Sequence, residues 1–410
     1  MGDILWAQLR AGLEQEPPAS IRLNPLKTVG RWTCHGDRIP WCAGGRYLAG
    51  RPAFTFDPLL HAGLYYVQEA SSMFLSHVLR TFVKEPVMML DLCAAPGGKT
   101  TCAASALPEG SELWSNEPDR RRAAVLAENV VKYGAPFVTV TNNVAADYAS
   151  AGMQFDVVLT DVPCSGEGMF RKDSGAIAEW STEKVASCAA LQRSILADIW
   201  PCLRPGGLLI YSTCTFNAHE DEENVEWIAR ELGADVLEIP VESSWHITGS
   251  LSGSIPVCRF LPGVSRGEGL FMAALRKRRA GSEAPKAHGK SHGLHVIAGG
   301  VGEPQRKCKN VIPDVSQALM ISSKRGEYPF VDTDYSTAIA YLRREAVTLP
   351  ADAPRGIVTV CYRGEPLGYA KNIGNRANNL YPQEWRIKST HLPTEIPEVL
   401  IEAAPSGTVR

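Results

Sequence analysis

The sequence predicts an α/β protein centred on a doubly wound parallel sheet, with a small N-terminal α+β part and a C-terminal β-containing part. Between residues 87 and 275, apolar runs of strand length alternate with amphipathic helical segments, which is typical of parallel strands joined by helical crossovers. Polar and nucleophilic residues follow directly after several of these runs. Because a parallel sheet gathers its functional groups at the carboxyl ends of its strands, we expect these residues to share one crevice.

Seven apolar segments are predicted strands, in chain order residues 87–92, 112–116, 137–140, 155–160, 208–213, 234–239 and 270–275. A helix is predicted over residues 184–203, whose apolar side chains fall on one face. Another is predicted over residues 220–232, where acidic residues in the first turn suit the positive end of the helix dipole.

The length of 410 residues exceeds one ordinary core and predicts several domains. We expect an N-terminal domain over residues 1–75 and the sheet domain over residues 76–278. Composition then shifts to Gly, Ser, Ala, Pro, Lys and His, which predicts a basic flexible linker over residues 279–300. A small β-containing domain is expected over residues 301–410, where residues 356–362 form an apolar run.

The composition, with 45% apolar and 21% charged residues, is that of a globular protein. No apolar run approaches the roughly 18 residues of a membrane span, and the start shows no secretory pattern. Eleven cysteines without a framework spacing therefore predict free thiols in a reducing cytoplasm, and no metal-ligand spacing is present. The net charge of −2 excludes a generally basic nucleic-acid coat, but it leaves a local RNA-binding stripe open.

A glycine-rich turn after the first predicted strand indicates a cofactor site. It reads Cys93-Ala94-Ala95-Pro96-Gly97-Gly98-Lys99-Thr100, and its small residues let a ligand approach the backbone at a helix start. A phosphate-binding P-loop requires glycine where Cys93 stands, so we expect a loop around S-adenosylmethionine instead. Glu117 follows the second strand, where a carboxylate can accept hydrogen bonds from two ribose hydroxyls; a plain surface carboxylate is the alternative.

Two cysteines and a carboxylate follow two further strands. Asp161 and Cys164 come after the strand at residues 155–160, and Cys214 comes after the strand at residues 208–213. A thiolate that adds to carbon 6 of a pyrimidine makes carbon 5 nucleophilic enough to accept a methyl group from a sulfonium. A carboxyl group at the ring edge stabilises the developing charge. We interpret the other cysteines in apolar settings as small packing residues.

These motifs carry a resemblance to the Sun-type RNA cytosine-5 methyltransferases. The segments at residues 93–99, 161–168 and 212–215 look like that family's motifs I, IV and VI. Other segments are similar to its N-terminal signatures and its late strand, namely residues 22–27, 66–72, 259–262 and 267–271. Within the family, the RsmF-type ribosomal RNA methyltransferases look closest, because residues 167–173, 367–371 and 381–386 resemble theirs.

The resemblance implies a Rossmann-like class I S-adenosylmethionine-dependent methyltransferase with an RNA-binding N-terminal domain and a PUA-like C-terminal domain. It implies Cys214 as the nucleophile, Cys164 in product release, and Asp161 in holding the base. The cofactor contacts that it implies are Cys93, Ala94, Ala95, Pro96, Gly97, Gly98, Lys99, Glu117, Asn143, Val144 and Asp161. The family usually has an acidic residue where Val144 stands, so Asn142 or Asn143 is expected to bind the adenine amino group.

The expected substrate is small-subunit (16S) ribosomal RNA or the small ribosomal subunit, bound by a cytoplasmic monomer without a membrane or metal partner. Transfer RNA is an alternative substrate, and a non-catalytic RNA-binding assembly factor is an alternative function. Arg171 and Lys172 follow the Cys164 loop, and they are either phosphate contacts or part of a solvated loop. The basic run Arg276–Arg279 is likewise either an RNA-binding stripe or a solubilising linker segment.

Overall fold

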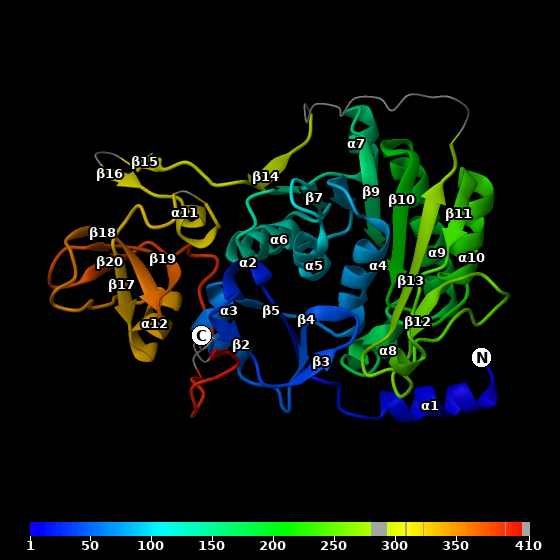
Figure 1. Ribbon diagram of the computed structural model, residues 1–410, viewed down its shortest axis with the longest axis horizontal. Helices are drawn as coiled ribbons and strands as arrows, with labels where there is room; N and C mark the ends of the chain where they lie inside the picture. The colour runs from blue at the N-terminus through cyan, green and yellow to red at the C-terminus, as the bar shows by residue number, and fades with distance from the viewer. Residues whose placement is uncertain (280–292, 308–309, 323, 390, 404–410) are drawn as a thin grey trace, which may run out of the picture.

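A nine-stranded sheet forms the centre of the computed structural model, which describes residues 1–279, 293–307, 310–322, 324–389 and 391–403 (Figure 1). The strand order is β11-β13-β10-β9-β6-β7-β8-β14, and β12 pairs with β13. The strands are β6 (Met88–Asp91), β7 (Glu112–Asn116), β8 (Val138–Thr141), β9 (Phe155–Asp161), β10 (Leu203–Thr213), β11 (Ala234–Leu237), β12 (Cys258–Phe260), β13 (Leu270–Lys277) and β14 (Val296–Gly299).

The five neighbours from β10 to β8 run parallel, and β13 lies antiparallel beside β10. Alternate residues of each strand enter cores on opposite faces of the sheet. Met89 packs in the core with α4 (Phe74–Phe82), α5 (Gly98–Ala106) and α6 (Arg120–Tyr133). Its neighbour Leu90 packs in the other core, with α7 (Ala145–Ser150), α9 (Thr182–Ile199) and α10 (Glu222–Trp227). The prediction of a doubly wound sheet is confirmed.

All seven predicted strands occur, with ends shifted by a few residues, as β6 to β11 and β13. The helix predicted over residues 184–203 is α9, and it ends at Ile199 because Pro201 leads into a 3₁₀ turn. The predicted helix over residues 220–232 is split. Its first half is α10, and a π-helical turn (Ile228–Gly233) completes it.

The end of the segment predicted as a linker is instead a strand of the sheet. Residues 293–300 include β14, which pairs antiparallel with β8, while residues 280–292 lie outside the described part of the chain. A free edge of β8 would leave backbone N–H and C=O groups unpaired, and β14 supplies their partners. The prediction of a linker over residues 279–300 is therefore wrong for residues 296–299.

The N-terminal part contains a four-stranded antiparallel sheet in the order β3-β4-β1-β5. Its strands are β1 (Ser20–Leu23), β3 (Asp37–Ile39), β4 (Cys42–Tyr47) and β5 (Tyr65–Val67). The helices of this part are α1 (Asp3–Leu13), α2 (Pro25–Thr28) and α3 (Pro58–His61). Asn24 and Asp57 cap α2 and α3 with their side chains, which explains why each short helix begins where it does.

The C-terminal part has a second four-stranded sheet, ordered β17-β18-β19-β20. Its strands are β17 (Phe330–Thr333), β18 (Gly356–Tyr362), β19 (Glu365–Asn372) and β20 (Ala377–Asn379). The predicted apolar run over residues 356–362 is β18. A hairpin of β15 (Gln305–Lys307) and β16 (Asn310–Ile312), followed by α11 (Val315–Leu319), precedes this sheet, and α12 (Tyr335–Leu342) lies between β17 and β18.

The N-terminal and C-terminal parts share one hydrophobic core, and Figure 1 shows the blue and the orange-red segments side by side. Ile21 and Trp32 belong to the same buried cluster as Val360 and Leu400. A last short strand, β21 (Ile401–Glu402), pairs antiparallel with β2 (Trp32–Thr33). The Trp32 indole N–H also donates to Glu365 Oε1 at 3.0 Å. The two ends of the chain are therefore joined by packing and by hydrogen bonds.

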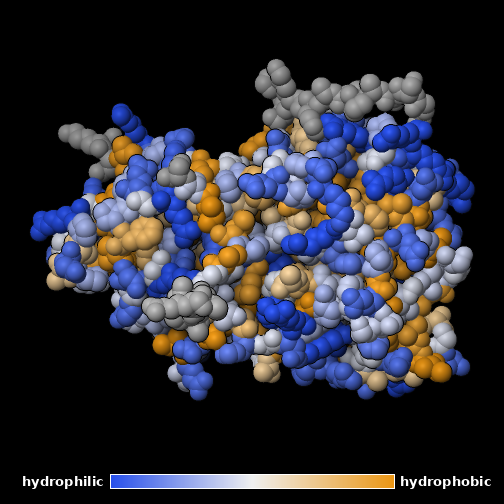
Figure 2. Space-filling model, viewed as in Figure 1, coloured by the Kyte–Doolittle hydropathy of each residue, from blue (hydrophilic) through white to orange (hydrophobic). Residues whose placement is uncertain are grey.

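The C-terminal part also rests on α6 of the central part. Val131 packs with Leu319 and Met320, and the Lys132 ammonium lies 5.4 Å from the ring centre of Trp385. A groove of about 710 Å³ follows this seam, and Figure 2 shows hydrophobic residues on the visible face between the two lobes. Among the described residues, no helix is long and apolar enough to cross a membrane.

Candidate active site

The two predicted catalytic cysteines meet at the carboxyl edge of the central sheet. Strands β9 and β10 are parallel neighbours, with Asp161 in register with Ser212, so the loops that follow them begin side by side. The Sγ atoms of Cys164 and Cys214 lie 3.0 Å apart. The crevice expected from the sequence thus contains both thiols, and both are partly exposed.

Asp161 completes this group, and the protein holds both of its carboxylate oxygens. Lys99 Nζ lies 2.9 Å from Asp161 Oδ2, and the Ser212 hydroxyl donates to Oδ1 at 2.9 Å. Burial has the largest single effect on the pKa of Lys99 and lowers it, but Asp161, Cys214 and Asp91 together outweigh burial and leave that pKa above its ordinary value. The charged ammonium of Lys99 therefore joins the glycine-rich turn directly to the Asp161 carboxylate at the end of β9.

The environment of Cys164 favours its protonated form. Its hydrogen bond with the Cys214 thiol, together with burial, raises the pKa of Cys164 well above its usual range. Two thiols at this separation cannot both ionise easily, because the first thiolate disfavours the second. The pair therefore holds one proton more firmly than the other, which suits unequal roles for the two sulfurs.

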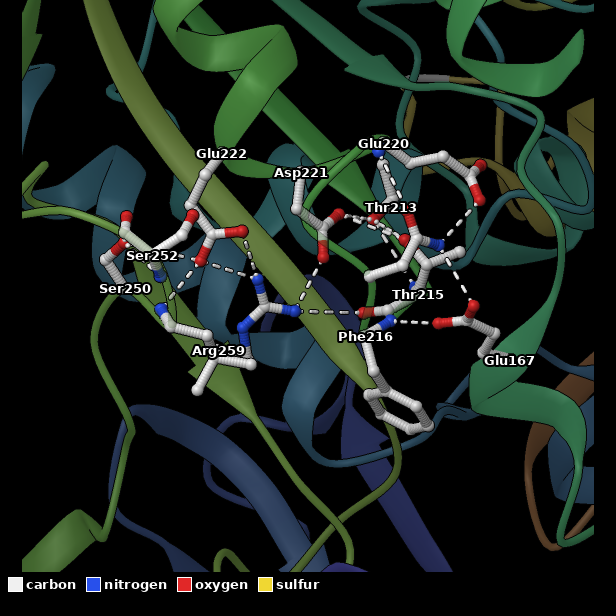
Figure 3. A network of polar contacts seen from close by, with 12 residues as sticks. Glu167, Thr213, Thr215, Phe216, Glu220, Asp221, Glu222, Ser250, Ser252 and Arg259 are labelled. Atoms are coloured by element: carbon white, nitrogen blue, oxygen red, sulfur yellow. Dashed lines mark hydrogen bonds and ion pairs between the residues drawn. The ribbon is translucent and has the colours of Figure 1, made fainter. Parts of the chain in front are cut away.

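The turn at the end of β10, residues 213–216, carries Cys214 and is tied to Glu167 of the neighbouring loop, as Figure 3 shows for Phe216. Gly168 N–H donates to the Cys214 carbonyl at 2.6 Å, and a Cβ at Gly168 would lie 2.7 Å from that oxygen. Glu167 accepts from Phe216 N–H at 2.6 Å and from the Asn217 amide at 3.0 Å. In the sequence, Glu167 stood out only as part of a motif. Its role in holding the turn depends on the contact between the Cys164 loop and the Cys214 loop, which a single sequence does not show.

Most of the predicted cofactor residues, residues 93–99 and Glu117, lie at the ends of β6 and β7. Gly97 has φ of 111° at the start of α5, a conformation that favours glycine, and Lys99 enters the helix just after it. Two buried carboxylate oxygens here have no hydrogen-bond partner, Asp91 Oδ1 and Glu117 Oε2. Arg122 Nη2 forms an ion pair with Glu117 Oε2 at 3.4 Å. Unsatisfied acceptors beside an open backbone turn fit a ligand that brings hydroxyl or ammonium donors.

The residues near the predicted adenine contact bind protein backbone. The Asn142 amide donates to the carbonyls of Glu117 and Pro118 at 2.8 and 2.9 Å. Asn143 Oδ1 accepts from His295 N–H at 3.0 Å, just before β14. Val144 is 56% exposed. Whether either amide also reaches an adenine stays a prediction, and the strand β14 is a neighbour that the sequence did not reveal.

Arg171 is neither a phosphate contact nor part of a solvated loop. Its side chain is 4% exposed and pairs with Glu268 at 2.9 Å, and it donates to the carbonyls of Gly12 and Gly267. Lys172 pairs with the same Glu268 carboxylate at 3.2 Å. Both sequence-based interpretations of Arg171 are wrong, because the chain folds α1 and the loop before β13 over it.

The basic run Arg276–Arg279 is not the start of a linker. Its first two residues end β13, where Arg276 donates to the Gly206 carbonyl at 3.1 Å. Arg278 pairs with Asp235 at 2.7 Å. Within the part of the chain that the structure describes, no group of three or more His, Cys, Asp or Glu side chains is arranged to hold a metal ion.

Three family models match consecutive parts of the chain. Residues 1–70 match the N-terminal domain of 16S rRNA methyltransferase RsmF, residues 80–276 match 16S rRNA methyltransferase RsmB/F, and residues 328–387 match the methyltransferase RsmF PUA domain.

Curated relatives match over most of their length. Ribosomal RNA small subunit methyltransferase F of Shewanella sp. (strain ANA-3) is 28% identical over 441 residues, which covers 89% of this chain and 90% of the relative. The protein of the same name from Pectobacterium atrosepticum is 35% identical over 276 residues, or 63% of this chain and 56% of the relative. A crystal structure of a methyltransferase homolog from Pyrococcus horikoshii is 26% identical and has a TM-score of 0.56, over 66% of this chain and 90% of that chain.

The sheet, the glycine-rich turn and the strand-end thiols define a Rossmann-like methyltransferase. The chain belongs to the RsmB/F family of 16S rRNA methyltransferases, and it carries that family's N-terminal and PUA domains.

Proposed function

We propose that this chain transfers a methyl group from S-adenosylmethionine to carbon 5 of a cytosine in 16S ribosomal RNA. The observation that carries the proposal is the pair of sulfurs 3.0 Å apart in the loops after β9 and β10, with the Asp161 carboxylate fixed by Lys99 at the end of β9. The names of the full-length relatives support the substrate. Together these two kinds of observation favour an active enzyme over an RNA-binding assembly factor.

The cofactor would lie across the ends of β6 and β7, where it would supply the electrophilic methyl group. The backbone of residues 93–99 would face its amino-acid part. Glu117 would accept hydrogen bonds from its ribose hydroxyls, which would give Oε2 the hydrogen-bond donor that it lacks beside the Arg122 ion pair. Lys99 would bind Asp161 throughout, so that the carboxylate points from the cofactor side toward the base.

In the proposed reaction, the Cys214 thiolate adds to carbon 6 of the cytosine, and Asp161 holds the polar edge of the ring. Carbon 5 then becomes nucleophilic and takes the methyl group. The negative charge of the Cys214 thiolate is consumed in the new C–S bond, so Cys164 no longer faces a neighbouring thiolate. Cys164 can then release its own proton to solvent and, as a thiolate, take the proton from carbon 5. Loss of that proton breaks the bond between Cys214 and carbon 6 and releases the product.

The target base must leave its stack to reach the crevice, at a cost of a few kcal/mol. We propose that the N-terminal and C-terminal parts offset this cost by binding RNA. Exposed basic residues that directly precede strands of the C-terminal sheet, such as Arg355 before β18 and Arg376 before β20, are candidates for phosphate contacts.

The test is to trap the covalent intermediate. Cys164→Ala, mixed with S-adenosylmethionine and cellular RNA, is expected to accumulate a protein–RNA adduct that survives denaturation. The further change Cys214→Ser is expected to remove the adduct. Cys188→Ala is the matched control, because its partly exposed thiol lies on α9 and belongs to neither strand-end loop, and it should turn over without accumulating adduct.

The substrate follows from sequencing the trapped RNA, which also decides between ribosomal and transfer RNA. If naked RNA gives no adduct, the same experiment is repeated with intact small subunits. Absence of both adduct and methylation there, with the wild-type protein included, would overturn the proposal in favour of an assembly factor.

A further inference from the structure

The two residues that flank Cys214 send their hydroxyls to one buried carboxylate. Thr213 Oγ1 donates to Asp221 Oδ1 at 2.6 Å, and Thr215 Oγ1 donates to the same oxygen at 3.0 Å. Figure 3 shows both threonines pointing toward Asp221, on the opposite side of the turn from Glu167. All three side chains are buried. Asp221 therefore closes a small ring of hydrogen bonds around the residue that carries the thiol.

Asp221 is in turn fixed by Arg259, from β12. Arg259 Nη1 lies 2.6 Å from Asp221 Oδ2, and Nη2 contacts both oxygens of Glu222 at 2.8 and 2.7 Å. The three charged side chains are at most 1% exposed. The Arg259 guanidinium also lies 5.0 Å from the ring centre of Phe271, on β13. A charge-paired group packed in this way has little freedom to move.

The backbone alone does not fix this turn. The pairing of β10 with β9 ends at Ser212, and its pairing with β13 ends at Thr213. Beyond that point the Gly168 hydrogen bond and the contact with Cys164 tie Cys214 itself to the neighbouring loop. Further restraint on the turn comes from side chains. The two threonines hold it on one side, where Arg259 Nη1 also lies 3.4 Å from the Thr215 carbonyl, and Glu167 holds it on the other.

We propose that Asp221 is the positioning group that holds the Cys214 sulfur beside Cys164. Arg259 clamps Asp221, and Asp221 acts through the hydroxyls of Thr213 and Thr215. The inference rests on the proposed function, in which Cys214 is the nucleophile. A displacement of about 1 Å at a reacting atom can lower a rate by about 100-fold. The effect should therefore fall on the chemical step rather than on binding.

The first test removes the hydroxyls and keeps the side-chain shape. Thr213→Val/Thr215→Val is expected to lower kcat by about 10- to 100-fold, with the KM values for RNA and cofactor within about twofold of wild type. Thr215→Ser keeps the hydroxyl, and it should retain most of the activity that Thr215→Val loses. Ser111→Ala is the control. It removes a buried hydroxyl that accepts from Val87 N–H at the amino edge of the sheet, and it should lower stability without changing kcat.

The second test measures the position of the sulfur without RNA or cofactor. Diamide takes the two thiol hydrogens and becomes a hydrazine, while an S–S bond forms between Cys164 and Cys214. We expect this disulfide, followed by peptide mapping, to form at least about fivefold more slowly in the double valine variant, because the sulfurs no longer rest in contact.

The two tests separate the inference from the proposed function. A wild-type protein that methylates nothing would overturn the proposed function, and the disulfide rate would still report on positioning. The inference would be overturned if the double valine variant melts cooperatively and has the kcat and the rate of disulfide formation of the wild type. If that variant does not fold, Thr215→Val and Thr215→Ser decide by the same criteria. Equal loss of kcat in these two single variants would also overturn it, because shape rather than the hydroxyl would then matter.

Discussion

Asp91 shows how a single buried carboxyl group can link stability to pH. Its side chain is fully buried, Thr100 donates to Oδ2 at 2.7 Å, and Oδ1 has no partner. Burial raises the pKa of Asp91 from 3.8 to about 7, although the Thr100 hydrogen bond opposes this shift. The folded protein therefore holds a proton on Asp91 at a pH where the unfolded chain has released it.

This linkage predicts that stability falls as the pH rises. The folded pKa lies above the unfolded value, so the contribution is fully present below pH 3.8 and is lost as the pH rises to about 7. The slope is on the order of 1 kcal/mol per pH unit within that window. Asp91→Asn stays neutral, so its melting temperature should fall less than that of the wild type between pH 5 and pH 7. If the melting temperatures of the two proteins fell equally between pH 5 and pH 7, the linkage would be contradicted.

The sequence could predict those site residues that come directly after a predicted strand. Cys164, Cys214 and Asp161 each come just after an apolar run, and the parallel register of β9 and β10 brings them together. The roles of Glu167 and Arg259 could not be predicted in the same way. Each acts on a segment about 40 to 50 residues away, and a single sequence carries no local pattern for such an interaction.

At the scale of elements, β14 couples the segment after residue 292 to the edge of the cofactor site. It extends the sheet beside β8, and the Asn142 N–H donates to the His295 carbonyl at 3.0 Å. Asn143 holds His295 from the other side. The loop that follows β8 is thus enclosed between β7 and β14.

Asn143→Ala is expected to loosen this enclosure. Amide hydrogen exchange of residues 295–299 should become faster, because the variant lacks two hydrogen bonds to His295. The affinity for S-adenosylmethionine should fall about threefold, which corresponds to roughly 0.6 kcal/mol. Ser150→Ala is a suitable control, since its hydroxyl bonds within α7. Unchanged exchange in Asn143→Ala would show that β14 is held by strand pairing alone.

At the scale of the whole molecule, the two ends of the chain depend on each other. Residues of β1 and β2 share a buried cluster with β18, β19 and Leu400, and Glu365 accepts from both Trp32 and Arg31. The family models place an N-terminal domain and a PUA domain in these regions, yet in the folded chain they form one packed unit. Packing between positions more than 300 residues apart leaves no trace in hydrophobic periodicity, so the sequence did not predict this unit.

Deletion of residues 301–410 is therefore expected to destabilise the N-terminal part as well as remove the PUA domain. The buried face of Ile21, Trp32 and Tyr65 would become exposed to water. Limited proteolysis should then cleave within residues 14–67, where the full-length protein resists. If residues 14–67 of the truncated protein resisted proteolysis as well as those of the full-length protein, a shared core would be contradicted.

For the same reason, a role of the C-terminal part in RNA binding is better tested with point variants. If Arg355 and Arg376 bind phosphates, Arg355→Gln and Arg376→Gln should each reduce the slope of log affinity against log salt by roughly 0.7 to 0.9. Titrations of RNA at several salt concentrations measure this slope. The wild-type slope in both variants would show that neither guanidinium binds a phosphate.

The shared core also has a consequence for synthesis on the ribosome. A growing chain emerges from its N-terminus, at about 5–20 residues per second. The first sheet therefore waits on the order of tens of seconds before β18 and β19, which complete its core, have been translated. During that interval its apolar face is open to chaperones, to premature pairing and to aggregation. For this chain, residues translated after position 330 complete the core that residues 21–65 begin.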